Sequence, residues 1–338
     1  MGITIKDVAQ MAGVSVTTVS HVINNTRYVS DGLRARVQDA IRELDYHPNA
    51  LARGLRGGES RTIGLIVPDN SNPFFAEVAR DIEDVGFAKG YSVILCNSDG
   101  DIKKESAYIE ILIAKKVDGV IFIASGSSHD HIQRLLRRDI PVVIADRDIS
   151  SFPVDMVMVS NEQGGYEATK YLLALGHKKI GCITGPSELT PSADRVRGYR
   201  RAILEENIPI IDEYIVSGDF RFQSGSAAME CLLNLADPPT AVFICNDMMA
   251  IGALRTLRKA GLKVPEDLSI VGFDDIELAS AVSPALTTIH QPIEEFANLT
   301  VKILLNRIHK KPAGKRRMVF ETRLVIRDSC AAPAGQGT

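Results

Sequence analysis

The feature that most constrains the fold of this chain is a series of short apolar runs, each followed by a stretch with helical periodicity. In chain order the runs are TIGLIVPD, YSVILCNSD, VDGVIFIAS, IPVVIAD, MVMVSN, KIGCITGP, AVFICND, LSIVGFDD and LTTIHQP. Each run is continuously apolar rather than alternating, which is typical of strands buried on both faces of a parallel sheet that is covered by helices. Residues 62–292 therefore predict an α/β fold with doubly wound parallel sheets.

The number of runs indicates more than one sheet. We expect about ten strands, counting the closing stretch MVFETRLVIRDS as a crossing or edge strand, whereas a sheet usually has about 4 to 6. The chain of 338 residues also exceeds a typical single domain. We expect a two-lobed core at 62–328, with lobe 1 at about 62–161 and 292–320, lobe 2 at about 162–291 and 321–328, and a frayed tail at 329–338.

The cysteines and the N-terminal sequence indicate the cellular compartment in which the protein is expected. The five cysteines are odd in number, scattered and without a Cys-x-x-Cys pair, which predicts neither a disulfide framework nor a zinc site. The start, MGITIKDVAQ, has no basic segment followed by an apolar one, and no run approaches about 18 apolar residues. We expect a cytoplasmic protein that spans no membrane and holds no metal or other cofactor.

Three short helices are expected at the N-terminus. Thr4 and Asp7 form a capping-box pattern for the first helix. Ser15 can cap the second helix, VTTVSHVIN, and Ser30 or Asp31 can cap the third. The side chains expected to face inward are Ile5, Val8, Ala9, Ala12, Val19, Val22, Ile23, Leu33, Val37, Ile41 and Leu44.

The spacing of these helices matches a helix-turn-helix, with Ala9, Gly13 and Val19 at its close-packing, turn and core positions. A plain three-helix bundle is the alternative. However, hydroxyl side chains and a valine are expected to be exposed at the N-terminal end of the second helix. Helix-turn-helix motifs direct this end at base edges in the major groove. The expected exposed residues are Val16, Thr17, Thr18, Ser20 and His21, and the candidate phosphate contacts are Asn24, Asn25, Arg27, Arg34 and Arg36.

The segment NALARGLRGG, residues 49–58, has the pattern of a helix that is too short to be stable alone. Asn49 can act as N-cap, and Leu51 and Leu55 share one face, but the helix has about two turns and contains Gly54. Isolated helices shorter than about 12 to 15 residues are marginal in water. A flexible linker is the alternative, although a linker would favour Ser, Gly and Pro over Ala-Leu-Ala-Arg.

The stretches TIKDVAQMAGVSVTTVSHVIN and HPNALARGLR resemble the DNA-binding headpiece and hinge of the lactose/galactose-repressor family. In that family the hinge helices of two subunits fold against each other in the minor groove, where paired leucines, here Leu55, open a base step. The resemblance implies a homodimer that binds double-stranded operator DNA, with a headpiece at 1–48 and a hinge at 49–61. The expected DNA-contacting residues are Thr4, Val16, Thr17, Thr18, His21, Asn24, Arg27, Asn49, Ala52, Arg53, Leu55 and Arg56.

Polar and aromatic side chains follow the carboxyl ends of the predicted strands, where ligands of open α/β sheets bind. Flat rings combined with carboxylate, amide and guanidinium groups suit a small polyol. Each residue taken singly could equally be a helix cap, a surface ion pair or a core residue, so the prediction rests on their convergence at one edge. The candidate ligand-binding residues are Asn72, Phe74, Phe75, Asp146, Arg147, Asn161, Arg195, Phe220, Asn246, Phe273, Asp274 and Gln291.

The core also resembles the periplasmic sugar-binding-protein fold that this family uses as its effector domain, and within it the ribose repressors and ribose-binding proteins. The motifs NPFF, DR, GDF, ND and GFD and the Gln before Pro292 stand at pentose-contacting positions. Arg147 stands where some repressors of the family carry tryptophan, which favours a polar sugar over a purine. The resemblance implies D-ribose or a related pentose as effector, with a purine or a hexose as alternatives.

Two other classes of protein are alternatives to a regulator. A free solute-binding protein for transport would need a signal peptide and would not carry a helix-turn-helix. An enzyme would need an activated group, and although Asp146, Asp274 and His290 could serve acid/base chemistry, we find no nucleophile elbow, phosphate-binding glycine loop or metal-ligand spacing. We expect a sugar-responsive transcription repressor rather than an enzyme, and a dimer rather than a tetramer because no C-terminal heptad segment follows the core.

Overall fold

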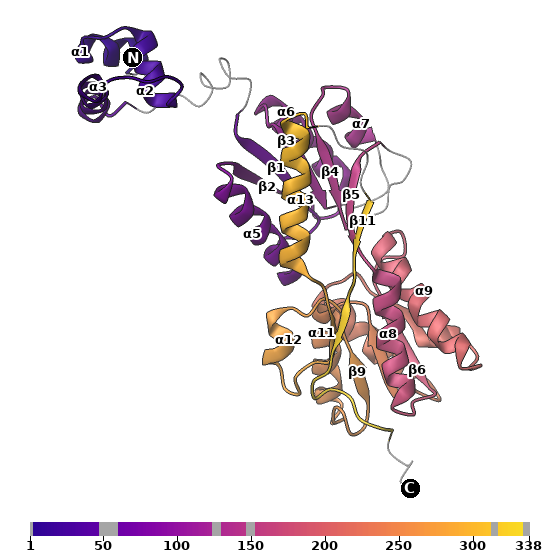
Figure 1. Ribbon diagram of the computed structural model, residues 1–338. Coiled ribbons are helices and arrows are strands. Elements are labelled where there is room, and N and C mark those ends of the chain that lie inside the picture. The colour runs from indigo at the N-terminus through magenta and orange to yellow at the C-terminus, as the bar shows by residue number, and fades with distance from the viewer. Residues whose placement is uncertain (1–2, 47–59, 124–129, 147–152, 312–316, 334–338) are drawn as a thin grey trace. The chain divides into compact units, whose positions relative to one another are not determined.

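The computed structural model describes residues 3–46, 60–123, 130–146, 153–311 and 317–333. The chain forms two compact units, Met1–Ser60 and Arg61–Thr338, which are called the headpiece unit and the core below (Figure 1). The predicted hinge residues Asn49, Ala52, Arg53, Leu55 and Arg56, and the predicted ligand contact Arg147, lie outside the described residues.

The headpiece unit contains the three predicted helices, α1 (Ile5–Ala12), α2 (Val16–Asn24) and α3 (Asp31–Glu43). The Asp7 carboxylate accepts the Thr4 N–H at 2.7 Å, and Ser15 Oγ accepts the Thr18 N–H at 3.1 Å, so both predicted caps are confirmed. Gly13 ends α1 with a φ of 60°, a left-handed conformation that favours glycine. The buried core of this unit is Val8, Ala9, Ala12, Val19, Val22, Val29, Val37 and Ala40.

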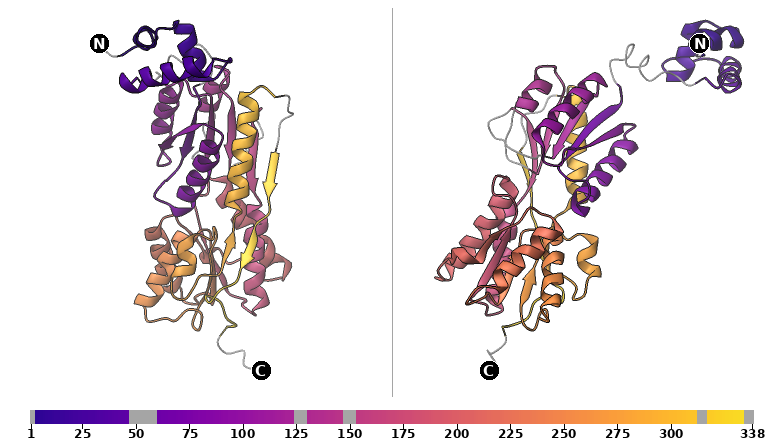
Figure 2. Two further views of the ribbon diagram at one scale, coloured as in Figure 1. Left: turned by 60° about the vertical axis from the view of Figure 1, so that its left-hand side comes forward. Right: turned by 180° about the vertical axis from the view of Figure 1, so that it is seen from behind.

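The first lobe of the core is built on a six-stranded parallel sheet. Its strands, in the spatial order β11-β5-β4-β3-β1-β2, are β11 (Arg317–Phe320), β5 (Asp155–Val159), β4 (Val142–Ala145), β3 (Gly119–Ile123), β1 (Thr62–Val67) and β2 (Ser92–Asn97). One face is covered by α5 (Pro73–Ala88) and α13 (Ile293–Ile308), and the other by α6 (Ile102–Ala114) and α7 (Asp130–Leu136) (Figures 1 and 2).

The second lobe has a four-stranded parallel sheet in the order β7-β6-β8-β9. The strands are β6 (Ile180–Thr184), β7 (Ile215–Ser217), β8 (Ala241–Ile244) and β9 (Ser269–Val271), and the flanking helices are α8 (Asn161–Ala174), α9 (Thr190–Glu205), α10 (Phe222–Leu233), α11 (Asp247–Lys259) and α12 (Glu277–Ala281). Strand β7 follows a short 3-10 helix, η1 (Asp212–Tyr214), and was not predicted because it has three residues and is only partly buried. The expectation of two doubly wound lobes is confirmed.

Among the described residues, three segments connect the lobes: β5 to α8, β10 (Thr288–His290) to α13, and β11 to β12 (Arg323–Val325) (Figure 1). Strands β10 and β12 pair antiparallel, and a bridge between Val271 and Thr287 links them to β9. MVFETRLVIRDS is therefore a crossing segment, as predicted. The tail predicted from Ser329 was wrong for its first residues, because Ser329 is buried and donates to the Ile270 carbonyl at 2.6 Å.

Candidate functional site

A cavity of about 300 Å³ lies between the two lobes of the core, at the carboxyl ends of their strands. Its volume is at the lower end of the range for small-molecule sites. Lobe 1 contributes Pro68, Asp69, Asn72, Phe74, Phe75, Asp99, Gly100 and Asp146; lobe 2 contributes Pro186, Glu188, Leu189, Pro191, Arg195, Asp219, Phe220, Arg221, Asn246 and Asp274.

Most of the predicted ligand-binding residues reach this cavity. Those on its wall are Asn72, Phe74, Phe75, Asp146, Arg195, Phe220, Asn246 and Asp274. Asn161, Phe273 and Gln291 are buried behind the wall and contact Arg195 or Asp274 instead. Phe273 is fully buried with the Arg195 guanidinium 3.7 Å from its ring centre, so the expectation that it offers a ring face to the ligand was wrong for this conformation.

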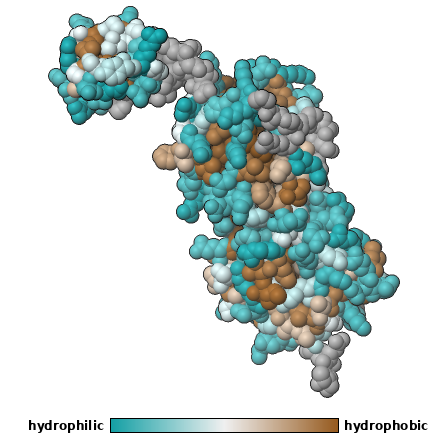
Figure 3. All heavy atoms as spheres, viewed as in Figure 1, coloured by the Kyte–Doolittle hydropathy of each residue, from teal (hydrophilic) through white to brown (hydrophobic). Residues whose placement is uncertain are grey.

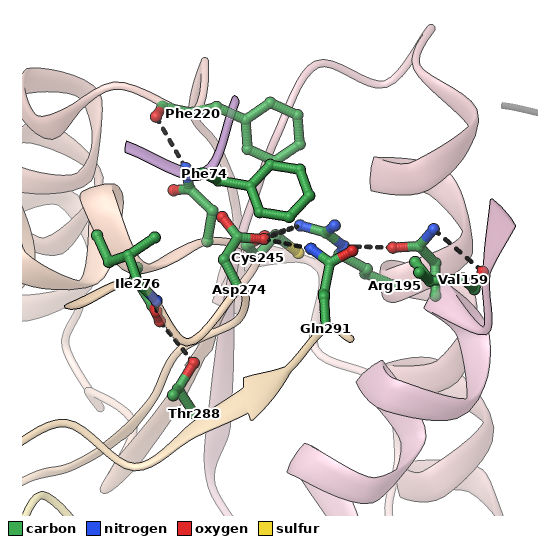
Figure 4. Close-up of polar contacts among 12 residues, drawn as sticks. Phe74, Val159, Arg195, Phe220, Cys245, Asp274, Ile276, Thr288 and Gln291 are labelled. Atoms are coloured by element: carbon green, nitrogen blue, oxygen red, sulfur yellow. Dashed lines mark hydrogen bonds and ion pairs between the residues drawn. The ribbon is translucent and has the colours of Figure 1, made fainter. Parts of the chain in front are cut away.

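Arg195 is the centre of the polar network in the cavity (Figure 4). Its Nε donates to Asn161 Oδ1 at 2.8 Å, and its Nη1 donates to the Cys245 carbonyl at 2.6 Å. The same Nη1 lies 3.5 Å from Asp274 Oδ1, and the side chain is only 4% exposed. Because several acceptors and the Phe273 ring fix the guanidinium, Arg195 is a preorganised group rather than a free cation.

Two glycines explain how Arg195 comes to lie opposite Asn161. A Cβ added at Gly165 of α8 would lie 2.2 Å from the Arg195 carbonyl oxygen, and one at Gly198 of α9 would lie 2.0 Å from the Glu162 carbonyl oxygen. Side chains are excluded at both positions, so the backbones of α8 and α9 approach closely. This approach brings the Arg195 side chain within hydrogen-bond distance of the first residue of α8.

Asp274 and Asp146 are the two carboxyl groups at the inner part of the cavity. Asp274 Oδ1 accepts from Gln291 Nε2 at 2.7 Å. Burial raises the pKa of Asp274 to about 7 and that of Asp146 to about 6, and in both cases the charge of Arg195 acts in the opposite direction. Both residues also have left-handed backbone conformations, with φ of 119° at Asp274 and 60° at Asp146. Strain of this kind in non-glycine residues is common where side chains are held for a ligand.

Asp247 lies behind Asp274 and fixes the loop that carries it. Its Oδ1 accepts from the Thr288 hydroxyl at 2.6 Å and its Oδ2 accepts from the Ile276 N–H at 3.1 Å. Burial raises the pKa of Asp247, and the neighbouring Asp274 raises it further. Asp247 therefore ties α11, β10 and the Asp274 loop together without reaching the cavity.

Two buried acceptors, one on the cavity wall and one directly behind it, have no hydrogen-bond partner among the described residues. They are Asp146 Oδ1 and Gln291 Oε1. Asn246, in contrast, has a partner for both its amide nitrogen and its amide oxygen, since it donates to the Phe220 carbonyl at 2.9 Å and accepts from the Met249 N–H at 3.0 Å. Buried acceptors without a donor cost free energy. The inner end of the cavity therefore requires hydrogen-bond donors from a ligand or from water.

The rim of the cavity carries charged residues that sequence reasoning missed. They are Asp69, Asp99, Glu188, Asp219 and Arg221. Arg221 Nε lies 3.6 Å from Asp69 Oδ2, an ion pair that joins lobe 2 to lobe 1. Asp69, Asp99 and Glu188 come shortly after β1, β2 and β6, so the same rule of strand ends, applied to every strand, would have found them.

In the headpiece unit, the predicted DNA-reading face is only partly exposed. Thr17 is exposed, whereas His21 is half-buried with Nδ1 2.8 Å from Thr26 Oγ1. Val16, the first residue of α2, is half-buried and packs against the core of the unit, so the expectation that it lies outside is confirmed only in part. The Thr4 hydroxyl donates to Asp7 Oδ2 at 2.7 Å as part of the N-terminal cap of α1.

Several of the predicted phosphate contacts have local partners as well. Arg36 donates to the Ala12 carbonyl at 2.6 Å and Arg34 to Asn25 Oδ1 at 3.1 Å. Asn24 donates to the Ser20 carbonyl at 2.9 Å, while Thr18 has its hydroxyl 2.9 Å from Ser15 Oγ. Arg27 is exposed on the turn that follows α2.

Other kinds of site find little support in the described residues. His290 pairs with Asp275 at 2.9 Å, Asp275 also pairs with Arg327 at 2.6 Å, and His290 is not on the cavity wall, so it forms no acid/base pair with Asp274 there. Within the described ranges, no cluster of three or more His, Cys, Asp or Glu could hold a metal ion. None of the described helices combines the length and apolar character needed to cross a membrane.

A helix-turn-helix unit followed by a two-lobed core with a ligand cavity defines the class of ligand-responsive transcription regulators. Residues 4–49 match the model of bacterial regulatory proteins of the lacI family, and residues 169–330 match the periplasmic binding protein-like domain. The chain belongs to the lacI family of bacterial regulatory proteins and is a DNA-binding transcription regulator.

Relatives and solved structures extend over nearly the whole chain. It is 42% identical to the transcriptional repressor PurR of Aliivibrio salmonicida (96% of this chain, 98% of the relative) and 42% identical to the ribose operon repressor of Escherichia coli K12 (96% and 99%). The lac repressor dimer bound to operator and the anti-inducer ONPF matches with a TM-score of 0.87 and 29% identity (98% and 100%). A LacI-family regulator from Enterococcus faecium with bound ribose matches with a TM-score of 0.74 and 34% identity (80% and 99%).

Proposed function

We propose that this protein is a homodimeric repressor whose affinity for operator DNA is controlled by D-ribose or a closely related pentose bound between the lobes. The observation that carries the effector assignment is the acceptor-rich inner end of a small cavity. Asp146 Oδ1 and Gln291 Oε1 are buried without donors, and Asp274 lies beside them. A pentose presents several adjacent hydroxyl donors on a compact frame, and carboxylates accept such bonds strongly.

Aromatic rings at the same cavity suit the apolar face of a sugar. Phe74 and Phe220 both line it (Figure 4). Phe75 packs edge-on against Phe74, with ring centres 5.2 Å apart. The relatives do not decide between sugar and purine, because the PurR and ribose repressor relatives are equally identical to this chain. A purine effector is therefore the second candidate, and the ribose-bound relative and the donor-poor cavity favour the pentose.

The DNA side of the proposal rests on the headpiece unit. We assign base reading to the exposed N-terminal part of α2, with Thr17, Thr18 and His21, and backbone contacts to Asn24 and Arg27. Val16 and Thr4 would act mainly by fixing α2 and α1. The segment 49–58 is assigned as the hinge that folds on the minor groove, with Leu55 as the wedge and Asn49, Ala52, Arg53 and Arg56 around it.

The homodimer is supported by the lac repressor dimer and by apolar surface on the core. Apolar side chains gather on the displayed face of each lobe (Figure 3). Edge strand β2 exposes Leu95 at 45%, and the opposite edge strand β11 exposes Met318 and Val319 at 42% each. Exposed apolar edge strands favour pairing with another protein surface, which in a homodimer is a second copy of the chain.

Calorimetry on the full-length protein tests the effector assignment. D-ribose, a hexose, hypoxanthine and guanine are titrated separately, and each is then added to an operator complex followed by fluorescence anisotropy. Binding of D-ribose that changes operator affinity is expected. Heat from a purine and none from D-ribose would overturn the pentose assignment and leave the DNA-binding assignment standing, because the two rest on separate residues.

A further inference from the structure

The charge on the wall of the cavity is strongly unbalanced. Among the described residues that line it, six are Asp or Glu and only two are Arg: Asp69, Asp99, Asp146, Glu188, Asp219 and Asp274 against Arg195 and Arg221. Like charges repel strongly in a partly closed site, where water screens them less than in bulk solvent.

We propose that the cavity selects the free, unphosphorylated sugar and rejects its phosphate ester, with Asp69, Asp99, Glu188 and Asp219 at the rim as specificity-determining residues. This inference rests on the proposed function, because it concerns the form of the pentose that the same site accepts. It assigns the protein to sensing a sugar before a kinase-class reaction acts on it. Phosphorylation of the sugar would therefore end the signal.

At the inner end of the cavity, the described residues offer a phosphate group no cation that is free of other partners. Arg195 is already bonded to Asn161, the Cys245 carbonyl and Asp274, and it is stacked on Phe273. A phosphate buried there would lie against Asp146 and Asp274. These are acceptors with no proton to give once ionised, whereas the hydroxyl groups of a free sugar are donors.

The rim gives the same result for a phosphate that points outwards. Arg221 is the cation on the described rim, and its Nε lies 3.6 Å from Asp69 Oδ2. Asp219 accepts the backbone N–H of Arg221, and Asp99 is paired with Lys104. With Glu188 included, the described rim carries four carboxylates and one guanidinium group, and the nearby Lys104 is paired with Asp99. Carboxylates therefore outnumber basic groups at the described rim.

Helix N-termini at the cavity could in principle favour an anion, but their donors are largely used. Asn72 accepts the Phe74 N–H at the start of α5, and Asn246 accepts the Met249 N–H at the start of α11. Pro73 and Pro191 occupy the first turns of α5 and α9 and have no N–H to donate. A helix terminus is also a partial charge of about half a unit, which is weaker than the full charges at the rim.

The test compares D-ribose with D-ribose 5-phosphate by calorimetry on the full-length wild type and on two double variants. Asp69→Asn/Asp99→Asn removes two rim carboxylates. Glu110→Gln/Asp212→Asn is the matched control: it also removes two carboxylates from exposed ion pairs, with Arg134 and Arg200, but neither residue lines the cavity. The quantity compared is the ratio of the two dissociation constants, ester over free sugar.

We expect the wild type to bind the ester at least tenfold more weakly, which corresponds to about 1.4 kcal/mol. The rim variant should lower the ratio by roughly threefold or more, and the control should leave it unchanged. Equal binding of ester and free sugar by the wild type, or equal ratios in the rim and control variants, would overturn the inference. If the rim variant does not bind the sugar, the same ratio of dissociation constants is measured for the single variants Asp99→Asn and Glu188→Gln. Wild type that binds neither compound would instead refute the pentose assignment.

Discussion

Asp146 and Asp274 make effector binding dependent on pH in a direction that the structure fixes. Burial raises the pKa of Asp146 to about 6 and that of Asp274 to about 7. A hydroxyl-rich effector would donate hydrogen bonds to the carboxylates and thereby favour their ionised forms. Binding should therefore release protons, and effector affinity should rise as the pH rises.

The size of the expected change in affinity follows from the fraction of the protein that is in the binding-competent, ionised form. If only ionised Asp146 accepts the effector, the apparent dissociation constant is the intrinsic one divided by the ionised fraction. For a pKa of about 6, that fraction rises from roughly one tenth at pH 5 to roughly nine tenths at pH 7, so the affinity should rise about tenfold. Asp274 lies in the same network and its pKa is raised to about 7, so its ionisation over the same pH range adds to the effect and about tenfold is the smallest rise expected.

Calorimetry at about pH 5 and pH 7, in two buffers with different ionisation enthalpies, measures both the affinity and the protons released. The variant Asp146→Asn cannot ionise at that position and should flatten the profile. An affinity that is constant or falls with pH, with no proton release, would refute the reasoning.

Thermal unfolding without effector provides an independent check that the pKa values of Asp146 and Asp274 are raised in the folded protein. Between the unfolded pKa near 3.8 and the folded values of about 6 and 7, the native state holds more protons than the unfolded state. The contribution of these groups to stability is therefore present at low pH and is lost as the pH rises through the folded pKa values. Replacing Asp146 by Asn should reduce this loss, while effector affinity in the wild type changes in the opposite direction.

Three further predictions concern single substitutions. Thr17→Ala should weaken operator binding by about 1 to 3 kcal/mol in anisotropy titrations, while Arg27→Ala weakens operator and scrambled duplex alike; equal losses for Thr17→Ala on both duplexes would remove it from the reading face. Leu55→Ala should leave effector binding intact but reduce DNA bending in gel-shift assays, and unchanged bending would return residues 49–58 to the status of a linker. Asp274→Ala leaves the buried Gln291 amide and the effector hydroxyl that Asp274 would accept without a partner, at about 1 to 3 kcal/mol per buried group. Calorimetry should therefore find effector affinity at least tenfold lower, whereas the exposed control Asp212→Ala should not change it.

Much of the fold could be predicted because its signals are local. Continuous apolar runs predicted the parallel strands, and the caps Thr4 with Asp7 and Ser15 predicted the starts of α1 and α2. Strand β7 was missed because three partly buried residues carry too little apolar signal. The first residues of the tail were misjudged because the burial of Ser329 depends on Ile270, some 60 positions earlier in the chain.

The cavity was located by the rule of strand ends, but the role of each residue there depends on long-range packing. Nothing local distinguishes Phe273, which is covered by Arg195, from Phe220, which lines the cavity. The backbones of Asp146 and Asp274, both left-handed, are likewise bonded to other segments, since their N–H groups donate to the Val157 and Ile289 carbonyls. Val16 looked exposed by periodicity, yet its packing depends on how α1 and α2 meet.

The segments that connect the lobes also carry the residues that hold the cavity network, and this suggests how effector binding reaches the DNA side. Asn161 follows β5 directly and accepts from Arg195, while Gln291 stands between β10 and α13 and donates to Asp274. The third connection is tied to the first, because the Thr322 N–H donates to Ser160 Oγ at 3.0 Å. A ligand that contacts Arg195 and Asp274 on the cavity wall would therefore act on side chains bonded to two of these connections. A change in lobe angle needs no long relay from the cavity, since Asn161 and Gln291, the residues bonded to Arg195 and Asp274, stand on the segments about which the lobes would turn.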